Sequence, residues 1–230
     1  MRGIRSFVKR EGRKTARQQR ALETLWEQYV IDLNQEIIDF TKIFGCNAPV
    51  VLEIGFGNGN ALFEIAKARP ECHFVGIEVY KPGIGTLLAK LEETKLNNVR
   101  IINEDAVKVL NQHIKDESLD AISIFFPDPW PKKRHHKRRL IQPAFCGLLA
   151  KKLKAKGRLH LATDWEDYAV QMMDVVSNLA LFYNQFGEGR FATDTQDRPL
   201  TKFEKRGQQL GHKIWDLIFI KTCDIDRSFT

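Results

Sequence analysis

The chain of 230 residues lacks any apolar run that approaches the ~18 residues needed to cross a membrane. Its N-terminal stretch is too basic and too polar for a secretory signal, so we expect a cytoplasmic protein. Cysteine is scarce, and Cys46, Cys72, Cys146 and Cys223 form no C-x-x-C pair. That spacing argues against a zinc site and against a disulfide framework. We therefore expect no metal and four reduced thiols.

Acidic residues are nearly absent from two segments, although the net charge of the whole chain is only +7. Residues 1–20 contain eight Lys or Arg and one acid, which accounts for the whole net charge. Residues 132–139 contain six Lys or Arg, two His and no acid, and residues 151–158 form a third basic run. Charge segregated in this way gives a surface with a positive face. RNA or DNA is the expected partner, and an anionic membrane surface is the weaker alternative.

Residues 1–20 also have almost no apolar content. We expect them to form a flexible basic arm, which either orders on a polyanion or is a tail without function. Residues 21–230 have a length that suits one α/β domain, and we expect a single domain there.

Short apolar runs alternate with helical segments along this domain. We expect strands at residues 50–54, 73–79, 99–103, 119–126, 157–163, 181–186 and 213–221. The alternation of strand and helix with short connections predicts a parallel sheet with helices on both faces. The last two strands flank a loop without a long crossover helix, which predicts an antiparallel pair at the end of the sheet.

A glycine turn follows the first expected strand, in the strand, turn and helix order that is typical of nucleotide-binding folds. Its glycines are Gly55, Gly57 and Gly59. Asn60 stands where a dinucleotide-binding G-x-G-x-x-G motif has Gly or Ala, which disfavours NAD. Glu53 lies two residues before the turn and favours a ligand that carries a positive charge. S-adenosylmethionine has a sulfonium, an ammonium and no phosphate, so it is the expected cofactor.

Four acids each close one of the successive expected strands: Glu53, Glu78, Asp105 and Asp128. The carboxyl ends of parallel strands meet at one edge of a sheet, where ligands of such folds bind. Glu78 stands where an acid accepts the ribose hydroxyls, and Asp105 is placed to accept the adenine amino group. Coincidence of a surface acid is the alternative for each of the four.

Prolines at positions 127, 129 and 131 end the fourth strand and hold Asp128 and Trp130 in an extended loop. The cations of residues 132–139 follow directly and are expected to bind phosphates, with support from the run at residues 151–158. A solvated charged loop is the alternative. Trp130 either stacks on a base or braces the loop.

Taken together, these motifs resemble those of bacterial tRNA (guanine-N7)-methyltransferases. The matching segments, in order and spacing, are LEIGFGNG, GIEV, NEDA, FPDPWPKKRHHKRR, LATDW and TKFE. The resemblance covers residues 50–230 and includes the basic arm in outline. Its most specific part is the segment at residues 126–139, because other methyltransferases carry different residues there. Adenine and cytosine amino-methyltransferases, for example, typically have a D/N-P-P-Y/F/W loop.

The resemblance implies a Rossmann-like class I methyltransferase fold, with a seven-stranded, mostly parallel sheet whose last strand is antiparallel. It implies S-adenosylmethionine as methyl donor and guanine 46 in the variable loop of tRNA as acceptor, forming 7-methylguanosine. The implied cofactor-binding residues are Glu53, Gly55, Gly57, Gly59, Glu78, Asp105 and Asp128. The implied substrate-binding residues are Lys132, Asp164, Thr201, Lys202, Phe203 and Glu204. RNA binding is expected from Arg134, His135, His136, Lys137, Arg138 and Arg139.

The chemistry of guanine N7 limits what a catalytic residue has to do. N7 has an in-plane lone pair and no proton to lose, so methyl transfer to it needs no general base. We expect Asp128 to be catalytic through orientation and negative charge. Asp164 and Glu204 are candidates to share recognition of the guanine edge with Asp128. A helix N-cap is the other role for Asp164, and the two roles can coexist.

Two other functions stay open from the sequence. One is a methyltransferase that acts on another RNA nucleotide, and the other is a non-catalytic RNA-binding protein that retains the fold. No obligatory protein partner is expected, and the chain is expected to be a monomer or a homodimer.

Overall fold

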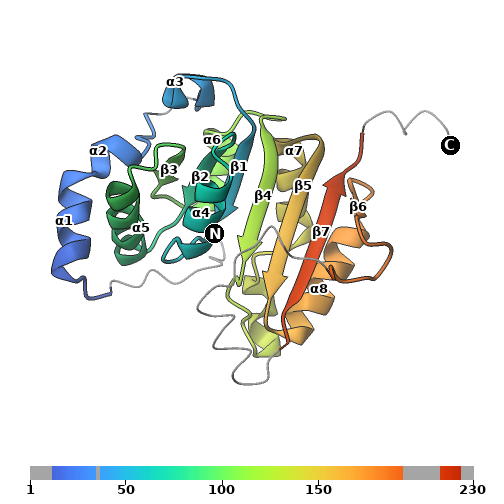
Figure 1. Ribbon diagram of the computed structural model, residues 1–230. Coiled ribbons are helices and arrows are strands. Elements are labelled where there is room, and N and C mark those ends of the chain that lie inside the picture. The colour runs from blue at the N-terminus through green and yellow to red at the C-terminus, as the bar shows by residue number, and fades with distance from the viewer. Residues whose placement is uncertain (1–11, 35–36, 194–212, 224–230) are drawn as a thin grey trace. The chain divides into compact units, whose positions relative to one another are not determined.

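The computed structural model describes residues 12–34, 37–193 and 213–223 of the chain. Within these residues, seven strands form a sheet in the order β3-β2-β1-β4-β5-β7-β6 (Figure 1). The described chain forms two compact units, divided between Lys115 and Asp116.

The N-terminal unit contains three parallel strands, β1 (Val50–Ile54), β2 (His73–Ile77) and β3 (Val99–Ile102). β2 pairs with β1 on one side and with β3 on the other. Every residue of β1 and β2 is buried. The strand at residues 50–54 has the expected bounds because Pro49 precedes its apolar run and Gly55 follows it.

Several helices of the N-terminal unit begin or end at residues that suit a helix terminus. α6 (Ala106–Gln112) begins at the N-cap Asp105, and α3 (Phe40–Phe44) ends at Gly45, whose φ of 79° is left-handed. Pro82 occupies the first turn of α5 (Lys81–Thr94). The remaining helices are α1 (Ala16–Thr24), α2 (Trp26–Tyr29) and α4 (Asn60–Ala68).

The basic arm is shorter than the sequence indicates, because α1 starts inside it. The Thr15 and Gln18 side chains cap α1 reciprocally, which fixes the start of the helix at Ala16. α1 packs along α5 (Figure 1), where the Arg20 guanidinium donates both of its Nη groups to Glu92 at 3.0 and 2.9 Å and Arg17 pairs with Glu93. Residues 1–11 lie outside the described part of the chain.

The C-terminal unit contains β4 (Leu119–Phe125), β5 (Leu153–Thr163), β6 (Phe182–Asn184) and β7 (Trp215–Lys221). β4 and β5 are parallel, whereas β7 is antiparallel to both β5 and β6. The prediction of an antiparallel pair at the end of the sheet is therefore confirmed.

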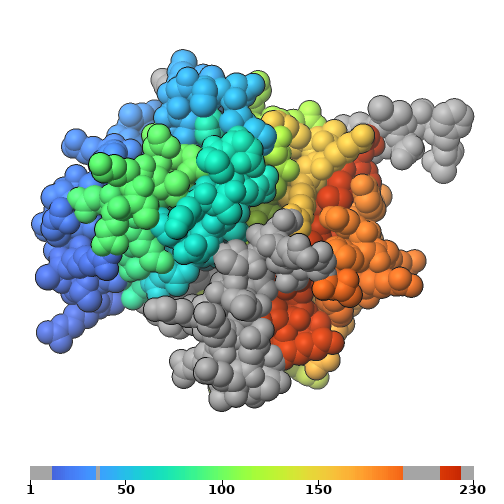
Figure 2. Space-filling view, in the orientation of Figure 1, coloured from blue at the N-terminus to red at the C-terminus, as the bar shows by residue number. Residues whose placement is uncertain are grey.

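Two α-helices and one 3-10 helix complete this unit. They are α7 (Pro143–Lys152), α8 (Glu166–Ser177) and η1 (Lys133–Arg138). α8 packs on β5 and β7, and in Figure 2 the surface of α8 and β6, in orange, borders that of β7, in red. Tyr168 of α8, Leu159 of β5 and Phe219 of β7 are all fully buried, and they belong to the core of the unit.

β5 begins four residues earlier than expected, and this changes the interpretation of the basic run at residues 151–158. Lys152 is buried, and its Nζ lies 2.6 Å from Asp116 Oδ1. Lys154 Nζ lies 2.7 Å from Asp120 Oδ2. The expectation that this run supports phosphate binding is wrong for Lys152, and Lys154 is neutralised by its partner.

None of the helices that the structure describes is long and apolar enough to span a membrane.

Candidate functional site

The glycine turn of the N-terminal unit adopts backbone angles that side chains rarely allow. Gly55, Gly57 and Gly59 have φ of 75°, 58° and 69°, all in the left-handed region that glycine enters without steric cost. The Gly55 N–H donates to the Ile77 carbonyl at 2.8 Å. The turn that follows β1 is therefore fastened to the end of β2.

Glu78 holds the same turn from its other side. Its Oε2 accepts the Gly57 N–H at 2.8 Å, and its Oε1 accepts the N–H groups of Val79 and Tyr80 at 2.7 and 2.9 Å. The sequence predicts Glu78 as a ligand of ribose hydroxyls. The structure adds a scaffold role, because this carboxylate joins the glycine turn to the start of α5.

Glu53 is a buried acid one residue from the end of β1, with 4% of its surface exposed. Burial, reinforced by the charge of Glu78, raises the pKa of Glu53 to about 8. Glu53 is therefore mostly protonated at pH 7. A cationic group beside it would favour its ionised form. That Glu53 binds a positive ligand stays a prediction.

Asp105 lies three residues beyond the end of β3, where it caps α6. Its Oδ1 accepts the Lys108 N–H at 3.0 Å. Next to it, the Asn103 side chain donates to the Glu78 carbonyl oxygen at 2.8 Å and ties the ends of β2 and β3 together. The sequence interpretation of Asp105 included no capping role and did not single out Asn103.

Gly83 is a residue of this site that the sequence analysis missed. A β-carbon at Gly83 would lie 2.0 Å from the Gly57 carbonyl oxygen, so α5 touches the glycine turn directly. The signal in the sequence was only a glycine within a helix, which has no fixed interpretation.

Gly83→Ala is expected to displace the glycine turn and to destabilise the protein by about 1–3 kcal/mol. Gly147→Ala in α7 is the matched control, because nothing lies within 4 Å of a β-carbon there. That control is expected to be neutral or to gain about 0.5–1 kcal/mol from helix propensity. Urea unfolding measures both changes, and equal stability of the two variants would contradict the close packing of Gly83 on the turn.

In the C-terminal unit, Asp128 lies on the exposed loop that follows β4. The Phe126 N–H donates to the Ala162 carbonyl at 2.8 Å, which continues the β4–β5 pairing into the loop. Phe126 and Trp130 have φ of 52° and 45°, in the left-handed region that is uncommon for non-glycine residues. The loop between the prolines is thus held in one defined and strained conformation.

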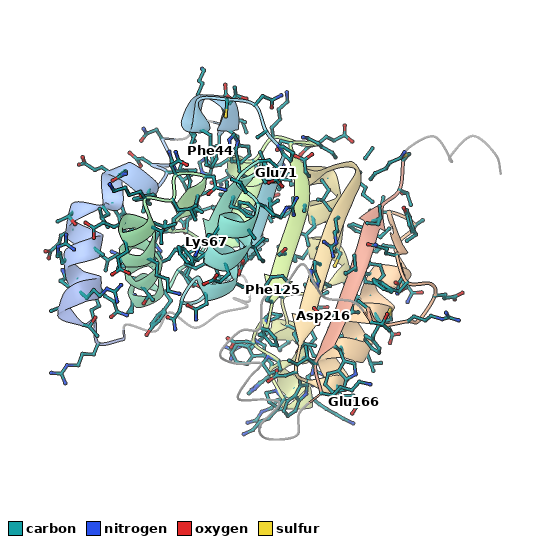
Figure 3. The ribbon with its side chains drawn as sticks, in the orientation of Figure 1. Phe44, Lys67, Glu71, Phe125, Glu166 and Asp216 are labelled. Atoms are coloured by element: carbon teal, nitrogen blue, oxygen red, sulfur yellow. The ribbon has the colours of Figure 1, made fainter. Side chains whose placement is uncertain are left out.

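A buried contact between His160 and Asp216, which the sequence did not indicate, joins β5 and β7. His160 Nε2 of β5 lies 2.8 Å from Asp216 Oδ1 of β7. The Phe125 ring at the end of β4 meets the His160 ring edge-on, with centroids 5.0 Å apart. Figure 3 labels Phe125 and Asp216 on their strands. These contacts fix the strand ends from which Asp128 and Asp164 follow.

The cations after Asp128 form the 3-10 helix η1, which the sequence analysis did not predict. Lys132, Lys133, Arg134 and Lys137 are exposed, as a phosphate-binding surface requires. The Arg138 guanidinium lies over the Trp130 ring at 4.5 Å. His135 meets the same ring edge-on at 6.0 Å. Of the two roles that the sequence allowed for Trp130, bracing the loop has these contacts in its favour.

The two histidines of this segment differ in their surroundings. Desolvation, together with the neighbouring cations, lowers the pKa of His135 below its ordinary value. His136 Nε2 lies 3.7 Å from Asp167 Oδ2.

Arg139 does not fit the expected RNA-binding role. Its side chain is 1% exposed, and its guanidinium contacts Asp167 of α8. A phosphate has no access to it in this structure, so the expectation for Arg139 is corrected. A uniform run of cations in the sequence gives no sign that its last member turns inward.

Asp164 directly follows β5. The N-cap of α8 is Trp165, which makes no side-chain capping bond, so the N-cap alternative for Asp164 is wrong. The Trp165 N–H donates instead to Thr163 Oγ1 at 3.2 Å. Trp165 is itself 37% exposed, which places an accessible aromatic ring beside Asp164 in the sequence.

The remaining predicted substrate residues, Thr201, Lys202, Phe203 and Glu204, lie outside the described residues. Within the described ranges, no group of three His, Cys, Asp or Glu side chains is arranged to hold a metal ion.

Comparison with known proteins places the chain among methyltransferases. A family described as "Putative methyltransferase" matches residues 47–217. The tRNA (guanine-N(7)-)-methyltransferase of Nitrosococcus oceani is 53% identical over 223 residues, which cover 97% of this chain and 93% of that protein. The enzyme of the same name from Hydrogenovibrio crunogenus is 50% identical over 218 residues, covering 95% and 91%.

Solved structures with the same fold are more distant in sequence. The 16S rRNA methyltransferase KamB is 14% identical, covers 85% of this chain and 99% of its own, and superposes with a TM-score of 0.59. A 16S rRNA adenine methyltransferase from Catenulisporales acidiphilia is 14% identical, covers 82% and 94%, and has a TM-score of 0.57. These likenesses confirm the Rossmann-like class I methyltransferase fold. Because the chain is at least 50% identical to the two relatives over nearly their whole lengths, it belongs to the tRNA (guanine-N(7)-)-methyltransferase family.

Proposed function

We propose that this protein transfers a methyl group from S-adenosylmethionine to N7 of guanine 46 in the variable loop of tRNA. The observation that carries the proposal is the 50% identity, over 95% of the chain, to a protein named for this reaction. The exposed Asp128, followed directly by exposed cations, supports the same substrate.

The donor is proposed to bind at the glycine turn of the N-terminal unit. Glu53, one residue before the end of β1, and Glu78, the residue after β2, support this placement, because two carboxyl groups suit a cation better than a diphosphate. The pKa of Glu53, raised to about 8 by burial, is expected to fall when a cation lies beside it. Glu78 is proposed to accept hydrogen bonds from the ribose hydroxyls. Asp105 is proposed to accept one from the adenine amino group.

When bound, S-adenosylmethionine supplies the methyl group from its sulfonium. No residue of the chain has to remove a proton, because guanine N7 reacts through a lone pair. Asp128 is proposed to accept hydrogen bonds from the N1–H and N2–H₂ edge of guanine, which adenine lacks. Its negative charge also favours the positive charge that develops on the purine ring during transfer.

Phosphate binding is proposed for the exposed cations around η1, which are Lys132, Lys133, Arg134 and Lys137. Arg138 and the two histidines contribute less in this proposal, because Arg138 and His135 contact Trp130 and His136 lies near Asp167. Asp164, and the four substrate residues from Thr201 to Glu204, are proposed to contact the guanine or its neighbours.

Nucleoside mass spectrometry tests the proposal. Unmodified tRNA transcript incubated with the protein and the donor is expected to yield 7-methylguanosine, and fragment mapping is expected to place it at position 46. A different methylated nucleoside would favour the alternative acceptor. Binding of tRNA without any methylation would favour the non-catalytic alternative.

Because tRNA is the proposed substrate, we place the protein in the cytoplasm. We further propose that the chain from α1 onward acts as one methyltransferase domain without an obligatory protein partner, as a monomer or a homodimer.

A further inference from the structure

We propose that Arg139 is a positioning residue that holds the loop carrying Asp128, rather than an RNA ligand. This role rests on the proposed methyl transfer, since it concerns the orientation of the carboxylate at which the guanine is expected to dock.

All three nitrogen atoms of the Arg139 guanidinium donate hydrogen bonds to other groups of the protein. Nε donates to the Pro129 carbonyl at 2.8 Å. Nη1 donates to Gln171 Oε1 and Nη2 to Asp167 Oδ2, both at 2.5 Å. The plane of the group lies over the Tyr168 ring at 4.8 Å. Of residues 132–139, Arg139 is the only one that is buried.

The hydrogen bond from Arg139 to the Pro129 carbonyl lies between Asp128 and the strained residue Trp130. Pro129 follows Asp128 directly, and its carbonyl belongs to the peptide that leads into Trp130, whose φ is 45°. A non-glycine residue in the left-handed region costs on the order of 1–3 kcal/mol. A hydrogen bond from a charged donor is stronger than one between neutral groups. The Arg139 bond can therefore hold the strained peptide and, with it, the direction of the neighbouring Asp128 side chain.

The opposite end of the guanidinium is fixed to a rigid element. Asp167 and Gln171 lie one turn apart on α8, whose Tyr168 is fully buried. Gln171 also donates to the Ile141 carbonyl at 3.3 Å, and the Ile141 N–H donates to the Tyr168 hydroxyl at 3.1 Å. The chain just after Arg139 is thus also tied to α8. The planar fork of an arginine suits such a junction, and a lysine cannot reproduce it.

Arg139→Lys separates positioning from RNA contact, since it keeps the charge and loses the fork. We expect kcat for methyl transfer to unmodified tRNA to fall by about 10–100-fold, because a misplacement of about 1 Å can cost about 100-fold. The tRNA Kd and its dependence on salt are expected to stay as in the parent. The matched control is Lys137→Ala, an exposed cation two residues earlier, which is expected to lower the slope of log K against log salt by about one unit.

Asp167→Asn provides a second variant that leaves every cation of the segment in place. Asp167 is 63% exposed, so the variant is expected to fold, which thermal unfolding checks. Loss of its charge weakens the anchor of Arg139 to α8. Positioning predicts that kcat falls again while tRNA binding holds. An RNA-binding Arg139, released from its acid, would instead bind tRNA more tightly with kcat unchanged, and that result would overturn the proposal.

The outcomes separate this proposal from the proposed function. A parent protein that forms no 7-methylguanosine would refute the methyl transfer itself. An active parent with unaltered kcat in both variants would refute the positioning role alone. If Arg139→Lys does not fold, Asp167→Asn decides the question by its kcat.

Discussion

Replacing Asp128 with alanine is expected to lower the rate of methyl transfer by on the order of 10²–10³-fold, the usual cost of one lost group that stabilises developing charge. The side chain is exposed, so its removal leaves the fold intact. A single-turnover assay at saturating tRNA and donor measures the loss, and thermal unfolding checks that stability is unchanged.

Asp128→Asn divides the proposed role into its two parts. The amide keeps a hydrogen-bond acceptor and loses the negative charge, so a rate between those of the parent and the alanine variant is expected. Because guanine N7 has no proton, neither variant should alter the shape of the pH–rate profile as loss of a general base would. A near-normal rate for Asp128→Ala would sink the assignment of Asp128.

Glu53→Gln is expected to weaken S-adenosylmethionine binding by about 10–100-fold, the range for losing a hydrogen bond to a charged group. The same change is expected to stabilise the ligand-free protein at alkaline pH, because it removes a buried carboxyl that must otherwise ionise. Glu53→Gln is thus expected to lower the affinity for the cofactor and to raise the stability of the ligand-free protein. Isothermal calorimetry measures the affinity, and urea unfolding measures the stability.

The sign of the pH dependence follows from the raised pKa of Glu53. The carboxyl titrates at its ordinary 4.5 in the unfolded chain and at about 8 in the folded one. Between these values the folded state holds the extra proton, so the contribution of Glu53 to stability is complete below pH 4.5 and declines as pH rises to about 8. The decline is at most about 1.4 kcal/mol per pH unit.

Cofactor binding should release this proton, since a cationic ligand favours ionised Glu53. Calorimetry in two buffers of different ionisation enthalpy is expected to detect up to about one proton released near pH 7 in the parent and none in Glu53→Gln. Glu64→Gln, at an exposed position of α4, is the control and is expected to behave as the parent. Equal proton release in parent and Glu53→Gln would remove Glu53 from the cofactor site.

Elements whose signal is local could be predicted from the sequence. β1 was predictable residue by residue, because its four apolar residues and Glu53 lie between two chain breakers, Pro49 and Gly55. The start of β5 was not, because Lys152 and Lys154 look like surface charges until Asp116 and Asp120 are seen beside them.

The candidate site divides in the same way. The acids that close strands were identifiable, because position after a strand is a sequence property. The scaffold roles of Glu78 and Arg139 were not, because they depend on partners such as the Gly57 N–H and Asp167 that only folding brings near. Gly83 was missed for the same reason, since α4 and β2 separate it in the sequence from the glycine turn that it contacts.

The central claim, that this protein methylates guanine N7, is tested most directly by removing the acceptor atom. A tRNA carrying 7-deazaguanine at position 46 has a C–H in place of N7 and keeps the N1–H and N2–H₂ edge. With a donor labelled in its methyl group, the account predicts normal binding of this tRNA, no transfer of label to it, and full transfer to the matched guanine tRNA. Label on the 7-deazaguanine tRNA would contradict the account, because the accepting atom would then lie elsewhere.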